Sequence, residues 1–285
     1  MSKVFAVSNQ KGGVGKTTTC INLAVGLVNQ GKKVLLVDAD PQGSMTVSLG
    51  YRNQDSLENS LATLMTSSIK NTDLKVGETL LHHVEGVDLI PGNIELAAMD
   101  VTLVNTMSRE KVMKNVIDTV KDNYDYVIID CMPSLGMMTI NSLACADSVI
   151  IPVQAEFLST TGTVQLLQTI SSVKRNINPE LNIDGILITM TDERTNLSKN
   201  IREQIHEVYG RNIKVYKDSI PRCVKASECT GVGESVFRYD PNGKATKAYA
   251  DFSKEVNENG KQVKRNKNQQ YRWFIFYAGV KGCIN

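Results

Sequence analysis

Short apolar runs and amphipathic segments alternate along most of this chain. The apolar runs lack polar alternation, which is typical of strands buried on both faces of a parallel sheet. The predicted strands cover residues 4–8, 33–38, 87–91, 126–130, 148–153, 184–189 and 212–216. Elsewhere apolar side chains recur at helical spacing, and the predicted helices cover residues 17–29, 109–121, 163–175 and 197–209.

This alternation predicts an α/β fold with a single doubly wound, mostly parallel sheet flanked by helices. Right-handed crossovers bring the carboxyl ends of the strands to one edge, where ligands bind in such folds. The sequence has no internal repeat. We expect one domain over residues 1–256 and a basic and aromatic tail over residues 257–285.

Composition narrows the class of protein. Of the 285 residues, 41% are hydrophobic and 22% are charged, which is ordinary for a soluble globular protein and excludes collagen-like, coiled-coil and wholly disordered chains. No apolar run approaches the roughly 18 residues of a membrane-spanning helix, and the first residues lack a secretory signal, so we expect a cytoplasmic protein. The cysteines form no Cys-x-x-Cys pair, and we expect free, mostly buried thiols.

Charge is distributed unevenly. The net charge is +2, but residues 257–285 carry six basic side chains against Glu258, so the tail holds +5 and residues 1–256 hold −3. Binding of nucleic acid by the body therefore requires a local basic patch. The tail also holds the single tryptophan, in an aromatic cluster at residues 271–277. We expect a poorly ordered extension, with contact to a membrane surface or to nucleic acid as the alternative.

The strongest chemical signal is a glycine-rich turn between the first predicted strand and helix, where residues 11–18 are Lys-Gly-Gly-Val-Gly-Lys-Thr-Thr. Glycines let backbone N–H groups turn toward phosphate oxygens, and the helix N-terminus adds a positive dipole end. The common P-loop pattern has glycine where this chain has Gln10. We expect Lys16 to reach the β- and γ-phosphates and the Thr17 hydroxyl to ligate Mg²⁺. The expected nucleotide-binding set is Gly12, Gly13, Val14, Gly15, Lys16, Thr17 and Thr18.

The turn resembles the deviant Walker A motif of the ParA/Soj/MinD ATPases, a group of P-loop NTPases. The resemblance covers about residues 2–256 and is closest to the short, chromosomal Soj branch. It implies ATP and Mg²⁺ as cofactors and an ATP-dependent homodimer that sandwiches the nucleotides. In that family the early lysine reaches the phosphates bound by the other subunit, and the resemblance gives this role to Lys11. A cation added in this way offsets charge on the transferred phosphoryl group, as an arginine finger does.

Two predicted strand ends carry carboxylates at the edge that holds the glycine-rich turn. The first begins Asp38-Ala-Asp-Pro-Gln-Gly and is similar to the family's first switch. The resemblance gives Asp40 the task of orienting the hydrolytic water, with a water-mediated contact to Mg²⁺, and gives Asp38 a supporting role. Residues 126–130 have the form of a Walker B strand, which delivers Asp130 to the metal through water. Met132 stands in the loop after Asp130, the second switch, where the family has proline. Proline fixes φ and methionine does not, so this loop should be less stiff than in the family.

A basic stretch at residues 194–225 carries eight basic side chains against three acidic ones, a local charge that suits DNA phosphates. The resemblance implies that Arg194 and Lys225 bind DNA without sequence preference and that Arg222 shares the task. An ordinary solvated face is the alternative. Pro221 matches the stretch that lies against the adenine base in the family.

These features indicate an ATP-dependent DNA-partitioning ATPase. We expect slow hydrolysis of ATP that a ParB-like DNA-binding protein stimulates, and an ATP-bound dimer that holds DNA until hydrolysis releases it. A MinD-like ATPase at a membrane surface is one alternative, but the tail shows no clean amphipathic stripe, so we expect no stable membrane association. A non-catalytic, nucleotide-dependent regulator is the other.

Overall fold

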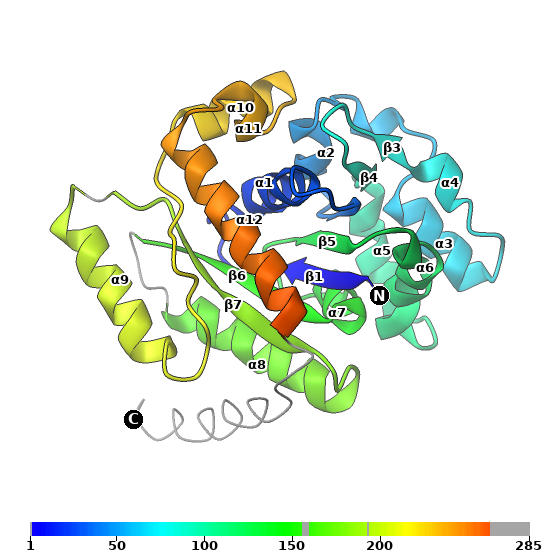
Figure 1. Cartoon of the computed structure of the whole chain (residues 1–285). Coiled ribbons are helices and arrows are strands. Elements are labelled where there is room, and N and C mark those ends of the chain that lie inside the picture. The colour runs from blue at the N-terminus through cyan, green and yellow to red at the C-terminus, as the bar shows by residue number, and fades with distance from the viewer. Residues whose placement is uncertain (1, 156–159, 193, 263–285) are drawn as a thin grey trace.

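The computed structural model describes residues 2–155, 160–192 and 194–262. Within these ranges seven strands form one sheet in the order β3-β4-β2-β5-β1-β6-β7 (Figure 1). The edge strand β3 pairs antiparallel with β4, and every other neighbouring pair is parallel. The strands are β1 (Lys3–Val7), β2 (Val34–Ala39), β3 (Leu81–His82), β4 (Asp88–Ile90), β5 (Tyr126–Cys131), β6 (Ser148–Gln154) and β7 (Asn182–Thr189).

Helices cover both faces of this sheet (Figure 1). One face packs against α1 (Lys16–Val28), α2 (Ser44–Ser48), α10 (Lys225–Val232), α11 (Val236–Tyr239) and α12 (Lys244–Gln262). The other packs against α3 (Leu61–Lys70), α4 (Val76–Thr79), α5 (Glu95–Val104), α6 (Val112–Val120), α7 (Met137–Cys145), α8 (Thr160–Asn176) and α9 (Asn196–Tyr209).

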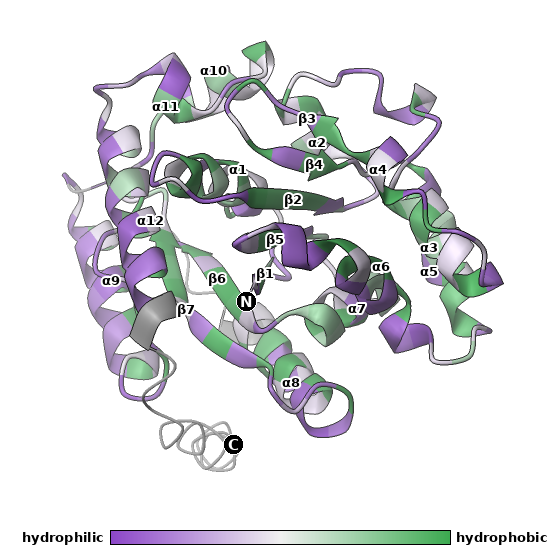
Figure 2. Cartoon of the chain, turned by 45° about the vertical axis from the view of Figure 1, so that its right-hand side comes forward, coloured by the Kyte–Doolittle hydropathy of each residue, from purple (hydrophilic) through white to green (hydrophobic). Residues whose placement is uncertain are grey.

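The alternating directions of side chains along β1 explain why the sheet has a core on each face. Phe5 and Val7 belong to the core beneath α1, whereas Val4 and Ala6 belong to the core beneath α7. Neighbouring strands β2 and β5 are buried along their whole length, as their uninterrupted apolar runs require. Figure 2 shows β2 and β6 as hydrophobic elements and α9 and α12 as largely hydrophilic ones. The predicted single, doubly wound and mostly parallel sheet is therefore confirmed.

Two predicted elements differ from the structure. Residues 212–216 do not form a strand and make only an isolated bridge between Ile186 and Val215. The chain leaves the sheet there because Tyr216 packs onto Gly185 and meets the ring of Phe252 edge-on, with 4.7 Å between ring centroids. The predicted helix at 109–121 is α6 flanked by two 3₁₀ segments, Arg109–Lys111 and Lys121–Asn123.

The last described helix passes the predicted domain boundary. α12 continues beyond residue 256 to Gln262. Asn257 is tied to the body, because its Oδ1 accepts a hydrogen bond from the Tyr126 hydroxyl at 3.0 Å and its Nδ2 donates to Gln30 Oε1 at 2.9 Å. The aromatic cluster of the predicted tail lies outside the described residues. None of the helices within the described ranges has the length and apolarity needed to cross a bilayer.

Candidate nucleotide site

The turn between β1 and α1 has the geometry of a phosphate cradle. Gly13 (φ 73°) and Gly15 (φ 83°) adopt the left-handed conformation that glycine enters without strain. A Cβ built on Gly12 or Gly13 would meet no described atom within 4 Å, so the space beside the turn is open. Among the described side chains, none caps the N-terminus of α1, and its first turn holds no acidic residue. The helix end can therefore bind phosphate oxygens.

Two contacts pin this turn to the sheet. The Thr189 hydroxyl, at the end of β7, donates to the carbonyl of the buried Val14 at 2.9 Å. Asn9 Nδ2 donates to the carbonyl of Pro152 in β6 at 2.6 Å. Because both anchors lie on strands of the rigid sheet, the cradle is held in shape before any ligand arrives.

The two lysines of the motif take different positions. Lys16 is buried, and its Nζ donates to the carbonyl of Lys11 at 3.2 Å across the turn. Lys11 reaches the other way, with its Nζ donating to Gln154 Oε1 at the end of β6, at 3.4 Å. Lys16 thus lies within the cradle of its own chain, and Lys11 lies on the sheet edge beside it.

The Walker B carboxylate lies directly against the cradle. Strand register places Asp130 beside Val7 on one side and Asp38 on the other. The Thr17 hydroxyl donates to Asp130 Oδ2 at 2.6 Å. Asp130 Oδ1 is buried and, within the described structure, has no hydrogen-bond partner. A buried carboxylate oxygen without a donor, next to a hydroxyl, fits a hydrated Mg²⁺ that keeps several of its waters.

The electrostatics at Asp130 also point to a cation. Burial, and then the neighbouring Asp38, raise the pKa of Asp130 to about 8, although Thr17 and Lys16 lower it. An ionised carboxylate is thus costly here unless a positive charge is added. Bound Mg²⁺ supplies such a charge.

Asp38 serves the fold of the first switch. It is fully buried, and its Oδ2 accepts hydrogen bonds from the backbone N–H of Thr46 at 2.8 Å and from the Thr46 hydroxyl at 2.7 Å. Burial raises the pKa of Asp38 to about 6, and the bonds from Thr46 oppose the rise. A Cβ on Gly92 would lie 2.6 Å from the Asp38 carbonyl, so the loop after β4 closes tightly over this carboxylate. Asp38 therefore fastens α2 to β2.

Asp40 is placed at the edge of the cradle, one residue beyond β2. It is half-exposed, and its Oδ1 accepts from the Gln42 N–H at 3.0 Å, which shapes the turn. Gly43 closes the turn at φ 57°, and a Cβ there would lie 2.9 Å from both the Gly92 carbonyl and Gln54 Cγ. The turn is thus wedged between two other segments, and it holds Asp40 close enough to Asp130 for the two charges to repel.

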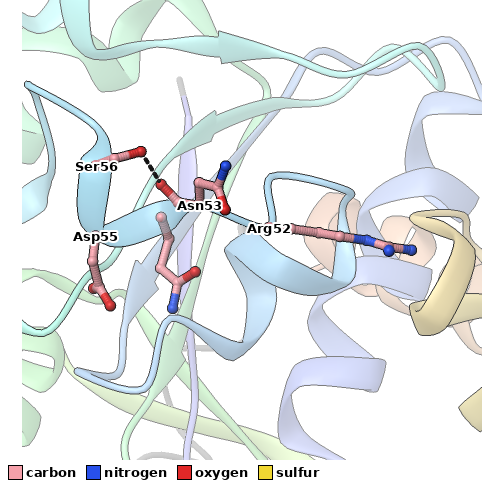
Figure 3. A pocket seen from close by; sticks show the side chains of 5 residues that line it. Arg52, Asn53, Asp55 and Ser56 are labelled. Carbon is pink, nitrogen blue, oxygen red and sulfur yellow. Dashed lines mark hydrogen bonds between the residues drawn. The ribbon is translucent and has the colours of Figure 1, made fainter.

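An open hollow lies beside the first switch. Its lining comes from the turn after α2 and from the 3₁₀ segment Gln54–Ser56 (Figure 3). Asp55 Oδ1 in this segment accepts from the N–H of Ile94 at 3.1 Å, just before α5. The hollow therefore adjoins the first switch through Gln54 and contains none of the predicted phosphate-binding residues.

The second switch has a partner that sequence patterns did not reveal. Asp100 of α5 accepts from the N–H of Met138 at 3.0 Å and thereby binds the first turn of α7. A Cβ on Gly136 would lie 2.8 Å from Asp100 Oδ2, so the loop after β5 presses on this carboxylate. Met132 is half-buried and packs against the core beneath α7. No motif marks Asp100, which is one of three polar residues in a mostly apolar helix.

The predicted DNA-binding residues gather beyond the end of β7. Thr191 bridges to Pro221, and the Arg222 N–H donates to the Thr191 carbonyl at 2.9 Å. This pairing brings the loop that bears the exposed Arg194 next to Arg222 and to the half-buried Pro221. Lys225 opens α10, but its Nζ is paired with Asp240 Oδ1 at 2.9 Å, which raises the pKa of Lys225.

Two other cations of the basic stretch are engaged elsewhere. Lys214 forms an ion pair with Glu255 at 2.5 Å and lies over the Tyr216 ring, and Arg202 donates to the carbonyl of Lys217 at 3.2 Å. These cations are used by the fold beside α12. Arg194, Arg222 and Lys225 remain the candidate DNA-binding residues, beside the exposed Lys199, Arg211 and Lys217 of the same stretch.

The buried thiols are inert. Cys20, Cys131 and Cys145 are buried, and burial raises the pKa of each, to about 12 for Cys131. A thiol so far from ionisation is neither a ready nucleophile nor a metal ligand. Among the described residues no cluster of His, Cys, Asp and Glu could hold a metal by itself. A magnesium ion here would rely on Thr17 and on nucleotide oxygens.

Known proteins resemble this chain along most of its length. A family model described as an AAA domain matches residues 2–183. The chain is 45% identical to the sporulation initiation inhibitor protein Soj of Bacillus subtilis, over 91% of this chain and 100% of that protein. It is 37% identical to the chromosome partitioning protein ParA of Myxococcus xanthus, over 90% of this chain and 88% of that protein. A solved structure of cobyrinic acid a,c-diamide synthase from Mycobacterium smegmatis, with bound ADP and magnesium, has a TM-score of 0.81 and 36% identity, covering 92% of this chain and 97% of that one.

Proposed function

This chain belongs to the ParA/Soj family of partition ATPases, and from that premise we propose that it is a DNA-partitioning ATPase switched by ATP. One observation carries the ATPase part of the proposal. The Thr17 hydroxyl is bonded to Asp130 at 2.6 Å, beside a buried carboxylate oxygen without a partner and directly below the glycine cradle. This is the arrangement that a nucleotide triphosphate with Mg²⁺ would complete.

Cofactor binding follows from the residues that line this edge. Gly12, Gly13 and the first turn of α1 would hold phosphate oxygens through backbone N–H groups, and Lys16 would hold the terminal phosphates. Thr17 would ligate Mg²⁺, with Asp130 and Asp40 each holding a water molecule of its shell. When bound, the ion neutralises charge that develops on the phosphates during transfer to water. The relative from Mycobacterium smegmatis binds ADP and magnesium, and its name describes another reaction, so only the bound groups support this proposal.

Hydrolysis then requires a placed water and an added cation. Asp40 lies at the strand ends near the cradle, in a turn fixed by Gly43, where its carboxylate can orient a water toward the terminal phosphate. Lys11 would leave Gln154 and reach the phosphates of the second subunit in an ATP-bound sandwich dimer. The intrinsic rate is slow in this scheme because the catalytic groups are complete only in the dimer.

DNA binding would use the surface beyond β7. Arg194 and Arg222 lie on adjacent loops, and Lys225 joins them when its pairing with Asp240 opens. These cations contact phosphates, which gives affinity without sequence preference. A ParB-like protein bound to its own DNA site would stimulate hydrolysis and release the dimer. Repeated cycles would move a chromosome, plasmid or mobile element along the nucleoid.

The test is a gel shift of linear double-stranded DNA at one stated salt concentration, with ATP, ADP or no nucleotide. We expect the DNA to be retarded with ATP, and not with ADP or without nucleotide. Arg194→Ala and Lys225→Ala should weaken the retardation for all sequences and lower the salt dependence by about one phosphate contact each. Lys199→Ala, which removes an exposed lysine of the same stretch from α9, is the control and should change little. Equal retardation without nucleotide would defeat the switch.

A further inference from the structure

The C-terminal ends of α2 and α10, two helices from distant parts of the chain, meet at a pair of glycines. α2 is followed by Gly50 at φ 92°, and α10 ends at Gly233 at φ 78°. A Cβ built on Gly233 would lie 2.8 Å from Gly50 Cα and 3.1 Å from Gly50 N. Carbon atoms in ordinary contact are about 3.5–4.0 Å apart. The two backbones therefore cross with no room for a side chain on Gly233.

Side chains fasten this crossing from both sides. Arg52, in the turn after α2, donates from Nη2 to the carbonyl of Gly231 at 2.5 Å, and its side chain extends toward α10 in Figure 3. His83 accepts the Glu85 N–H on Nδ1 at 3.3 Å, so its Nε2 carries the proton that reaches the Gly233 carbonyl at 3.1 Å. The end of α10 is thus held to the turn after α2, and Gly233 is held to the loop between β3 and β4.

The far ends of the two helices carry the two proposed sites. α2 starts directly after the Asp40–Gly43 turn, and its Thr46 is bonded twice to Asp38. α10 starts with Lys225, three residues after Arg222. The helices also share one apolar core, through Met45 and Leu49 on one side and Cys229 on the other.

We propose that the crossing of Gly50 and Gly233 couples the nucleotide switch to the cationic end of α10. This inference rests on the proposed function and names the positioning residues through which ATP controls the DNA surface. When the Asp40–Gly43 turn adjusts to a bound triphosphate, the start of α2 moves with it, because the helix begins at Ser44, directly after Gly43. The bonds from Thr46 to Asp38 hold the helix to β2, so that it pivots about them. A crossing without a gap transmits that movement as a rigid contact, since packed interfaces are not continuously deformable. α10 then shifts, and Lys225 is presented differently in the two nucleotide states.

The experiment separates coupling from simple strain. Gly233→Ala forces the backbones apart by about 1 Å, given ordinary carbon contacts. Gly31→Ala is the matched control, because Gly31 has φ 76° and a Cβ there would meet no described atom within 4 Å. Both variants carry the same left-handed strain, but only one disturbs the crossing. Arg52→Ala removes the bond to Gly231 without adding strain.

For each protein the affinity for one linear DNA duplex is measured by fluorescence anisotropy with ATP and with ADP, and the affinity for ATP is measured separately. In Gly233→Ala the ratio of the two DNA affinities should fall by about fivefold or more, the range of ordinary couplings, with ATP affinity within about twofold of the parent. In Arg52→Ala the same ratio of DNA affinities should fall by about two- to threefold, since one of several hydrogen bonds that hold the crossing is lost. Gly31→Ala should keep the parental ratio.

The following results would overturn the proposed coupling. A parental ratio in a folded Gly233→Ala, or an equal loss in Gly31→Ala, overturns the coupling and leaves the proposed function intact. If Gly233→Ala does not fold by circular dichroism, Arg52→Ala decides alone, and an unchanged ratio there overturns the inference. If the parent protein binds DNA equally with ATP and ADP, the proposed function fails, and the coupling fails with it.

Discussion

Replacing Asp130 with asparagine should stabilise the protein without nucleotide and abolish its stabilisation by ATP and Mg²⁺. Burial and Asp38 raise the pKa of Asp130 from 3.8 to about 8. Because the folded-state pKa lies above the unfolded one, the carboxyl favours folding when protonated, and this advantage is lost as pH rises from about 4 through 8. Because a tenfold change in acidity corresponds to about 1.4 kcal/mol, the loss is on the order of 5 kcal/mol at most.

Asparagine at position 130 removes this charge but leaves an amide donor where Oδ1 had no partner in the described structure. An unsatisfied buried donor costs about 1–3 kcal/mol, so the net gain at pH 8.5 should be about 2 kcal/mol. That gain corresponds to a rise in Tm of roughly 4–8 °C for a domain of this size. The gain should shrink toward pH 5, where the parent is protonated.

Thermal unfolding followed by circular dichroism between pH 5 and 8.5, with and without ATP and Mg²⁺, measures both effects. The parent should gain about 2–3 kcal/mol at ligand concentrations of about 100 times Kd, and Asp130→Asn much less. Asp73→Asn, on an exposed turn, is the control and should follow the parent. A lower Tm for nucleotide-free Asp130→Asn at pH 8.5, or an undiminished shift with ATP and Mg²⁺, would refute the assignment of Asp130 as a carboxylate awaiting a cation.

Three further variants test the rest of the site. Asp40→Ala should lose ATP turnover by at least about 100-fold in a phosphate-release assay while ATP still drives dimerisation, because the carboxylate acts on the water; retained turnover contradicts its role. Lys11→Ala should keep the Tm shift with ATP and Mg²⁺ but remain monomeric by light scattering, since Lys16 and the backbone of the glycine turn hold the nucleotide within one subunit, whereas Lys11 would reach the other; an ATP-dependent dimer contradicts the reach across subunits. Asp100→Ala should cost about 1 kcal/mol in urea unfolding by removing the cap on α7, and an unchanged midpoint would show that the cap contributes nothing.

Local patterns were sufficient for the sheet and the phosphate loop. A strand buried on both faces carries apolar residues without polar alternation, so β2 and β5 are visible in the sequence as apolar runs that end in a single aspartate. The loop was predictable for a similar reason. Its function depends on backbone conformation and on a helix start, and Gly13, Gly15 and Lys16 lie within four residues of one another.

Tertiary structure decided how the carboxylates and cations are used. Sequence alone placed Asp38 and Asp130 at strand ends, but only strand order brought them side by side, and only Thr46, eight residues on, gave Asp38 its role. Lys225 is one basic residue among eight in its stretch, and its pairing with Asp240 depends on how the chain returns after α10.

The crossing of Gly50 and Gly233 shows most clearly what the sequence alone could not predict. Each glycine, taken singly, is an ordinary helix terminator, and nothing in the local pattern relates two positions 183 residues apart. Secondary structure follows from periodicity because its hydrogen bonds and buried faces are local. Contacts between distant segments depend on the whole packing of the sheet and its helices, so only the folded chain shows which glycine cannot be replaced.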